Sequence, residues 1–252
     1  MALELPRSVL ITGASSGIGR ALALGYAGVG VRLQLGGRDA VRLAEVAQAC
    51  RAAGATVELA QVNVADRPAM AAWLGQAHRA LPLDLVLANA GIDGSAFAVA
   101  ERTHAIFRAN VEGVLNTVEP ALVLMQAAGR GQIGIVSSLA GLRGLSSAVA
   151  YSASKAAVRA YAEGLRGRHA GEGIRVSAIC PGFVASPMTA NNRFPMPMLW
   201  TAERAAARIK RGLARNQGRI AFPLPLYLAI RALDLLPQAL VDRLLRRLPR
   251  KG

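Results

Sequence analysis

The sequence predicts a single doubly wound α/β domain, in which a parallel sheet is covered by helices on both faces. Short apolar runs alternate with longer amphipathic runs along most of the 252-residue chain. The apolar runs are almost continuously hydrophobic, which is typical of strands buried on both faces of a parallel sheet. No linker rich in Pro, Gly or Ser and no block of like charge divides the chain, so we expect one domain.

The expected elements follow one another regularly. The predicted strands cover residues 8–13, 31–36, 56–64, 83–91, 131–138 and 173–182. The predicted helices begin at about residue 17 and then cover residues 39–54, 66–80, 100–128 and 151–170. Asp39 stands where its carboxylate would cap the second helix. Ligands of such folds bind beyond the carboxyl ends of the strands, so we expect the site there.

Composition bounds the class of protein. Hydrophobic residues make up 53% of the chain and charged residues 18%, which excludes a disordered protein. Cys50 and Cys180 are the only cysteines, and neither has the spacing of a metal or redox pair, so we expect a reducing cytoplasm and no metal site. The chain enters an apolar run within a few residues of Met1, so we expect no secretory signal.

The net charge of +15 is unevenly distributed. Residues 202–252 contain twelve basic and three acidic residues, so most of the excess lies in the last fifth of the chain. No helix-turn-helix, zinc-finger or aromatic RNA-binding motif accompanies these charges. We therefore expect no nucleic-acid partner.

A glycine-rich turn follows the first predicted strand. Residues 12–19 read TGASSGIG, with glycines at positions 13, 17 and 19. Glycine lets the backbone approach a pyrophosphate closely, and the N-terminus of the following helix presents free N–H groups to it. The turn therefore predicts a dinucleotide site. The alternative is a glycine-rich turn that binds no ligand.

A serine, a tyrosine and a lysine form a second candidate site. Tyr151 and Lys155 are four residues apart in an Ala-rich run, so on a helix their side chains share one face. An ammonium beside a phenol lowers the phenol pKa from about 10, toward the range useful for acid–base catalysis. Ser138 can add a hydrogen bond to the same substrate oxygen. The alternative for the Tyr–Lys pair is a half-buried aromatic beside a solvated charge.

Five motifs occur in order between residues 8 and 190: SVLITGASSGIGRAL, LANAG, NVEGVLNT, the pair IVSS and YSASK, and CPGFVASPM. In these motifs and their order the chain resembles the short-chain dehydrogenase/reductase family. The resemblance implies a Rossmann-type sheet and an NAD(P)-dependent oxidoreductase. Such an enzyme moves a hydride between nicotinamide and a small-molecule carbonyl or secondary alcohol. The last quarter of the chain has no motif of the family.

The resemblance also implies catalytic roles. Ser138 would orient the substrate oxygen, Tyr151 would donate or accept the proton, and Lys155 would lower the phenol pKa and hold the nicotinamide ribose. Asn110 would complete a proton relay through a bound water and kink its helix. The alternative for Asn110 is a solvent-facing side chain, because asparagine is unfavourable inside a helix.

Cofactor contacts are implied at a larger set of positions. Besides Tyr151 and Lys155, this set is Gly13, Ser15, Ser16, Gly17, Ile18, Gly19, Arg38, Asn63, Val64, Asn89, Ala90, Gly91, Pro181, Gly182, Val184 and Ser186. Two members depart from the family pattern. Asn63 replaces an Asp beside the adenine, and Ser186 replaces a Thr beside the nicotinamide carboxamide. Both retain hydrogen-bonding groups. Asn89-Ala90-Gly91 could also serve only to support the sheet.

The end of the second predicted strand indicates which cofactor is preferred. An acid there would bind the adenosine ribose and repel a 2′-phosphate. In this chain Gly37 occupies that position, and Arg38 follows where relatives that prefer NADP have Arg. We therefore expect NADP(H) to be preferred, with NAD(H) as the alternative.

Residues 187–215 are expected to include a substrate lid. Residues 187–200 are rich in Pro, Met and aromatic residues, which oppose a regular helix and offer an adaptable apolar surface. This composition favours an apolar or lipid-like substrate. The alternative is a loop folded on the core.

The predicted domain ends at residue 222, and residues 223–252 form a basic amphipathic tail. An apolar stripe of Leu240, Val241, Leu244, Leu245 and Leu248 suits an interfacial helix, whereas three prolines with Arg231 and Asp234 oppose a spanning one. We expect peripheral contact with the inner face of a membrane, or packing on the chain's own pocket or on a sister subunit. A homodimer or homotetramer is expected.

A nucleotide-binding regulator or scaffold without turnover is the competing function. The fold alone does not exclude it. Asn110, Ser138, Tyr151 and Lys155 are all present, and a binding module would not need them. The sequence therefore favours an enzyme.

Overall fold

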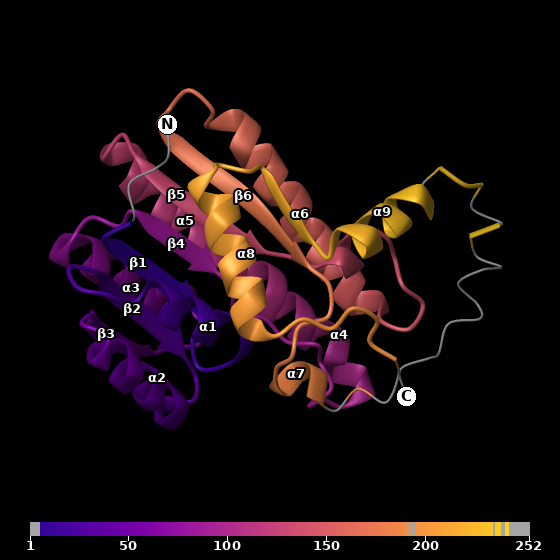
Figure 1. Cartoon of the computed structure of the whole chain (residues 1–252), viewed down its shortest axis with the longest axis horizontal. Helices are drawn as coiled ribbons and strands as arrows, with labels where there is room; N and C mark the ends of the chain where they lie inside the picture. The colour runs from indigo at the N-terminus through magenta and orange to yellow at the C-terminus, as the bar shows by residue number, and fades with distance from the viewer. Residues whose placement is uncertain (1–5, 191, 193–194, 234, 238–239, 242–252) are drawn as a thin grey trace.

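A seven-stranded, fully parallel sheet forms the centre of the computed structural model, which describes residues 6–190, 192, 195–233, 235–237 and 240–241 (Figure 1). The strand order is β3-β2-β1-β4-β5-β6-β7. The strands are β1 (Ser8–Thr12), β2 (Arg32–Gly37), β3 (Thr56–Gln61), β4 (Leu85–Ala88), β5 (Gly131–Val136), β6 (Ile174–Pro181) and β7 (Arg219–Phe222). The first six match the predicted strands, with β2 ending one residue later than expected, at Gly37. β7 was not predicted, because four residues are too few to establish a period.

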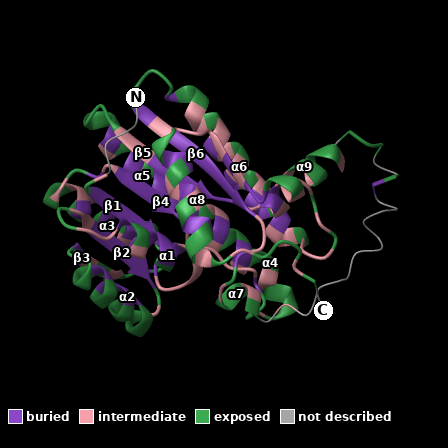
Figure 2. Ribbon diagram, in the orientation of Figure 1, coloured by how far each residue is buried: buried purple, intermediate pink, exposed green. Residues whose placement is uncertain are grey.

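Helices cover both faces of the sheet. One face is covered by α1 (Gly17–Tyr26), α2 (Ala40–Ala52) and α8 (Ala202–Ala214). The other face is covered by α3 (Arg67–Ala80), α5 (Gly113–Ala127) and α6 (Val149–Arg168). Figure 2 shows the strands buried between these layers. The predicted doubly wound fold is therefore confirmed.

The central strand β1 illustrates why its sequence is continuously apolar. All five of its residues are buried. Val9 and Ile11 point into the core under α1 and α2, whereas Leu10 points into the core under α3 and α5. Because both faces of the strand are covered, neither can be polar.

Acidic caps begin two of these helices. The Asp39 carboxylate accepts a hydrogen bond from the Arg42 backbone N–H at 3.0 Å, which confirms its predicted capping role in α2. Asp66 caps α3 in the same way, through the Ala69 N–H at 3.0 Å. Each cap therefore fixes the residue at which the helix begins after the preceding strand.

The helix expected over residues 100–128 is interrupted. It divides into α4 (Val99–Phe107), a π-helical turn (Arg108–Glu112) and α5. Asn110 lies in this π-turn and is completely buried. Single π-turns inside α-helices occur frequently at functional sites. The predicted continuous helix is therefore interrupted at Asn110.

Three named helices, α7 to α9, lie among the described residues after β6. The first is the short α7 (Pro187–Ala190). The next, α8, buries Ala205, Ala206 and Ile209 in the same core as α1, so the second half of the expected lid segment is a core helix. The last, α9 (Leu224–Leu233), follows β7 and packs Leu226 and other apolar side chains against the opposite core. In the part of the chain that the structure describes, no helix is long and apolar enough to cross a membrane.

The strand order reverses between β1 and β4, and this point defines the crevice. Parallel sheets bind ligands at such a switch point, beyond the carboxyl ends of the strands. Thr12, the last residue of β1, accepts hydrogen bonds through Oγ1 from the backbone N–H groups of Asn89 at 3.0 Å and Ala90 at 3.1 Å. The two diverging strand ends are therefore tied together at the mouth of the crevice.

Candidate active site

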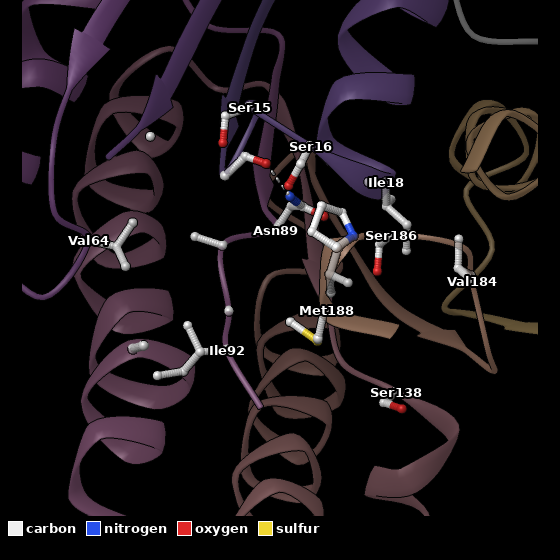
Figure 3. Close-up of a pocket in the computed structure, with 18 of the residues that line it drawn as sticks. Ser15, Ser16, Ile18, Val64, Asn89, Ile92, Ser138, Val184, Ser186 and Met188 are labelled. Carbon is white, nitrogen blue, oxygen red and sulfur yellow. Dashed lines mark hydrogen bonds between the residues drawn. The ribbon is translucent and has the colours of Figure 1, made fainter. Parts of the chain in front are cut away.

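A pocket of about 410 Å³ lies at the switch point. The structure brings all the predicted site residues to its wall except Gly19 and Asn110. Figure 3 shows Ser15 and Ser16 of the glycine-rich loop, Asn89 after β4, and Ser186 and Met188 after β6 among the side chains that line the pocket. Segments that are far apart in the sequence thus converge on one cavity.

The glycine-rich loop is held closely against the end of β4. Gly13 has φ of 66°, and a Cβ there would lie 2.8 Å from the Ala90 Cα. The Asn89 side-chain Nδ2 donates to the carbonyls of Thr12 at 2.9 Å and Gly13 at 3.1 Å. Gly19 lies beneath the loop, where a Cβ would be 2.2 Å from the Gly13 carbonyl oxygen. Asn89 and Gly19 therefore shape the loop from below.

The end of β2 forms the basic end of the pocket. Gly37 is buried, and Arg38 beside it is exposed on the pocket wall. Arg42 also lines the pocket, and its Nε pairs with the Asp39 carboxylate at 2.7 Å. Asn63 accepts the Ala65 N–H through Oδ1 at 3.1 Å, so the group it can offer a ligand is its amide Nδ2. Sequence analysis missed Arg42, because an Arg on a helix surface is unremarkable.

Tyr151, Ser138 and Lys155 also line the pocket. Ser138 lies close enough to Tyr151 for its side chain to lower the phenol pKa. The Lys155 Nζ lies 5.8 Å from the centre of the Tyr151 ring and donates to the Val136 carbonyl at 3.0 Å. Lys155 is only 3% exposed. The predicted sharing of one helix face is therefore realised within α6.

Burial dominates the titration of this pair. It raises the pKa of Tyr151 to about 12, against the lowering effect of the Ser138 hydrogen bond, and Asp93 raises it further. Burial also lowers the pKa of Lys155 to about 8. These directions correct the expectation that the ammonium would lower the phenol pKa in the protein alone. The reason is that both groups lose water, while the ammonium is directed at a backbone carbonyl.

Asn110 lies behind the pocket. Its Oδ1 accepts the Ile92 N–H at 2.8 Å, and its Nδ2 donates to the Ile92 carbonyl at 2.9 Å and to the Ser154 Oγ at 3.1 Å. Both amide hydrogens are thus used inside the protein. The side chain is a clasp between the loop after β4 and helix α6, and it is not the solvent-facing residue of the alternative interpretation.

Several supporting residues were missed by sequence analysis. Ser154 donates through Oγ to the Tyr151 carbonyl at 2.8 Å, and Ser137 donates through Oγ to the Lys155 carbonyl at 2.6 Å. Thr189 closes the turn after β6 through its contacts with Val184 and Ser186. A buried serine inside a helix or beside a strand end is the signal that could have identified the first two, because its hydroxyl must find a partner.

Comparisons with known proteins agree with this geometry. A family model described as short chain dehydrogenase matches residues 7–196. An uncharacterised oxidoreductase from Myxococcus xanthus is 41% identical over 250 residues, which cover 96% of this chain and 97% of that protein. A 3-ketoacyl-ACP reductase from Sinorhizobium meliloti has a similar structure, with a TM-score of 0.77 and 27% identity, over 88% of this chain and 99% of that chain. A short chain dehydrogenase from Mycobacterium paratuberculosis bound to NAD has a TM-score of 0.73 and 25% identity, over 85% of this chain and 94% of that chain.

The buried ammonium predicts a pH dependence of stability. The pKa of Lys155 is about 8 in the folded protein, and an unfolded lysine has a pKa of about 10.4. Between these values the unfolded state binds more protons, so the unfolding free energy rises with pH. We expect the stability of the wild type relative to Lys155→Met to increase between about pH 8 and about pH 10 in urea unfolding.

Tyr151→Phe is the matched control for that measurement. Burial raises the pKa of Tyr151 to about 12, and an unfolded tyrosine titrates near 10, so the window of Tyr151 lies at higher pH. Its stability relative to the wild type should stay flat up to about pH 9. A wild-type minus Lys155→Met difference that is equally flat would contradict the buried ammonium.

Proposed function

The chain belongs to the short-chain dehydrogenase/reductase family and is an NAD(P)-dependent oxidoreductase, and we propose that it uses NADP(H) to interconvert a carbonyl and a secondary alcohol on an apolar, lipid-like substrate. The observation that supports this reaction is the meeting of Ser138, Tyr151 and Lys155 on the wall of the pocket that also holds the glycine-rich loop. A regulator that binds a nucleotide without turnover would have no use for this arrangement.

The roles of the residues follow from their contacts. When bound, the nicotinamide supplies or accepts the hydride. Ser138 and Tyr151 hold the substrate oxygen, and in the direction of reduction the Tyr151 hydroxyl gives its proton to that oxygen. The Lys155 ammonium then stabilises the phenolate that remains. Asn110 holds α6 and the loop after β4 together, which keeps the Tyr151 and Lys155 side chains in place for the proton transfer.

Removal of the Tyr151 hydroxyl tests this chemistry. We expect Tyr151→Phe to bind NADPH as tightly as the wild type and to lose roughly 10²–10⁴-fold in kcat, the range typical of general acid–base catalysis. A panel of ketones and secondary alcohols, followed at the nicotinamide absorbance, provides the assay. Undiminished turnover by Tyr151→Phe would reject the assignment. Tight NADPH binding without turnover of any panel member by the wild type would favour the regulator.

The preference for NADP(H) is supported by the end of β2. Gly37 leaves no acid at the position that would meet a 2′-phosphate, and Arg38 lies on the same wall with a guanidinium suited to bidentate phosphate pairing. A charge-assisted contact of this kind contributes about 1.5–3 kcal/mol, which corresponds to a factor of roughly ten to a hundred or more in affinity.

Fluorescence titration tests the preference. We expect NADPH to bind the wild type more tightly than NADH, and Gly37→Asp to reverse that order. A Cβ at Gly37 would meet Leu43 at 3.4 Å and the Ser15 Oγ at 3.6 Å, so the pocket has room for the new side chain. Gly28→Asp adds the same charge where a Cβ would meet no other atom within 4 Å, and it should change nothing. Equal dissociation constants for the two cofactors in the wild type would defeat the claim.

An apolar substrate is supported by the segment beyond α7. Met198 is 51% exposed and Leu199 is 45% exposed, and Met188, earlier in the same segment, lines the pocket. Trp200 stacks on Phe222 with ring centres 4.9 Å apart and forms a β-bridge with Val184, so it anchors the far end of this segment. Because α8 begins at Ala202 and belongs to the core, the lid comprises residues 187–200. The related 3-ketoacyl-ACP reductase is named for an acyl-chain carbonyl substrate.

The C-terminal tail brings the enzyme to the inner face of a membrane. We propose that it acts there as a cytoplasmic homodimer or homotetramer, with NAD(H) as its secondary cofactor. The support is the exposed apolar surface of Leu224, Leu228 and Leu235, which precedes the basic residues of the sequence end. Most of the predicted amphipathic stripe, residues 242–252, lies outside the described residues.

Co-sedimentation with lipid vesicles tests the membrane contact. Basic residues near an anionic surface contribute on the order of 1 kcal/mol each, so Arg243→Gln, Arg246→Gln and Arg247→Gln together should weaken binding about a hundredfold. The substitutions keep α9 intact, and neutral vesicles provide the control for charge. If the wild type bound neutral and anionic vesicles equally, or if the triple variant bound as tightly as the wild type, the tail would be a packing or oligomer element instead.

A further inference from the structure

The catalytic face of α6 continues beyond the pocket. Tyr151, Lys155, Arg159 and Glu163 are each four residues apart, so they form one ridge along the helix. The first two line the pocket, whereas the second two do not. Arg159 and Glu163 form an ion pair along the ridge, with the Arg159 Nη1 2.7 Å from the Glu163 Oε2.

Arg159 contacts the loop that presents Ser138. Its Nε donates to the Gly141 carbonyl at 3.2 Å. Gly141 ends the 3₁₀ turn (Leu139–Gly141) that follows Ser138, and its N–H donates back to the Ser138 carbonyl at 3.0 Å. A Cβ on Gly141 would lie only 2.6 Å from the Lys155 carbonyl carbon, so the turn rests directly on α6. The place of Gly141 therefore determines the place of Ser138.

Glu163 holds Arg159 from the other side. Its second oxygen, Oε1, accepts hydrogen bonds from the Arg219 Nε at 3.0 Å and from the Arg219 Nη2. The Arg219 Nη1 in turn donates to the Tyr227 hydroxyl on α9 at 3.2 Å. One carboxylate thus lies between two guanidinium groups and links α6 to β7 and α9. The three charged side chains are 22–33% exposed, so they are only partly screened by water.

We propose that Arg159 and Glu163 are positioning residues that set the place of Ser138 relative to Tyr151 without touching substrate or cofactor. Without the Glu163 charge, the two partly buried guanidinium groups would repel each other, and Arg159 would leave the Gly141 carbonyl. The 3₁₀ turn would then lose its tie to the ridge, and the Ser138 hydroxyl would lose its alignment with the Tyr151 hydroxyl. The expected effect on catalysis rests on the proposed function of Ser138 and Tyr151.

The test compares Arg159→Ala, Arg159→Lys and Glu163→Gln with a matched control. Glu58 is also a partly exposed acid that accepts from two side chains, Arg32 and Gln34, but it lies on β3 and outside the pocket lining. Glu58→Gln therefore removes a partly exposed ion pair, with one guanidinium group where Glu163 has two, without reaching the Ser138 loop. It should lower the melting temperature by no more than Glu163→Gln does and leave kcat within about twofold.

Steady-state kinetics should separate positioning from general stability. We expect Arg159→Ala and Glu163→Gln to lower kcat about tenfold, the effect of one misaligned hydrogen bond in the transition state, with the KM for NADPH unchanged. Arg159→Lys keeps the charge but cannot reach Gly141 and Glu163 together, so it should recover part of the loss. Wild-type kcat in both Arg159→Ala and Glu163→Gln, or an equal loss in Glu58→Gln, would overturn the proposal.

Hydrogen exchange gives a second readout that needs no turnover. Amide exchange over residues 138–142 should accelerate in Arg159→Ala and Glu163→Gln, because the 3₁₀ turn loses its tie to α6. The same peptide should be unchanged in Glu58→Gln. Unchanged exchange in both site variants would overturn the proposal even if the wild type turned over no carbonyl. If the wild type turned over no carbonyl but the site variants still exchanged faster, the positioning proposal would stand and the proposed function would be wrong.

Discussion

The burial of one ammonium group organises the site. An unpaired charge removed from water is costly, so Lys155 must keep a strong acceptor within reach. That acceptor is the Val136 carbonyl at the end of β5, and the tie is reciprocal, because the neighbouring Ser137 hydroxyl donates to the Lys155 carbonyl. Helix α6 is therefore fixed to the sheet at the level of Tyr151 and Lys155. The tyrosine one turn earlier is aligned as a result.

The hydrogen bonds that tie α6 to the end of β5 also explain why supporting polar residues surround this helix. Ser154 joins Asn110 to the Tyr151 carbonyl, and Asn110 joins this serine to the loop after β4. Each of these buried hydroxyl and amide groups has hydrogen-bond partners within the protein. The result is a rigid polar frame behind the pocket, while the cavity itself faces the ligand with its glycine-rich loop and apolar side chains.

Much of the fold could be predicted from the sequence, because local patterns determine it. The strand periods, the glycine-rich turn and the Asp39 cap depend on residues a few positions apart, and the structure has them where expected. The convergence of Ser138, Tyr151 and Lys155 followed from the helix period and the rule for parallel sheets. These features need no knowledge of how distant segments pack.

Features that depend on tertiary packing were less predictable. The direction of the Tyr151 pKa shift depends on how much water is excluded, which spacing does not reveal. The π-turn uses Asn110 as a clasp only because Ile92 and Ser154 lie beside it in the fold. The sequence predicts α8 as part of a lid because its small apolar residues do not by themselves indicate a core position. In the fold they pack against α1 in the core.

The glycine-rich loop is already shaped by Asn89 and Thr12, so its ordering entropy is lost during folding. The dinucleotide then meets a preorganised cradle, so little of its binding free energy is spent on ordering the loop.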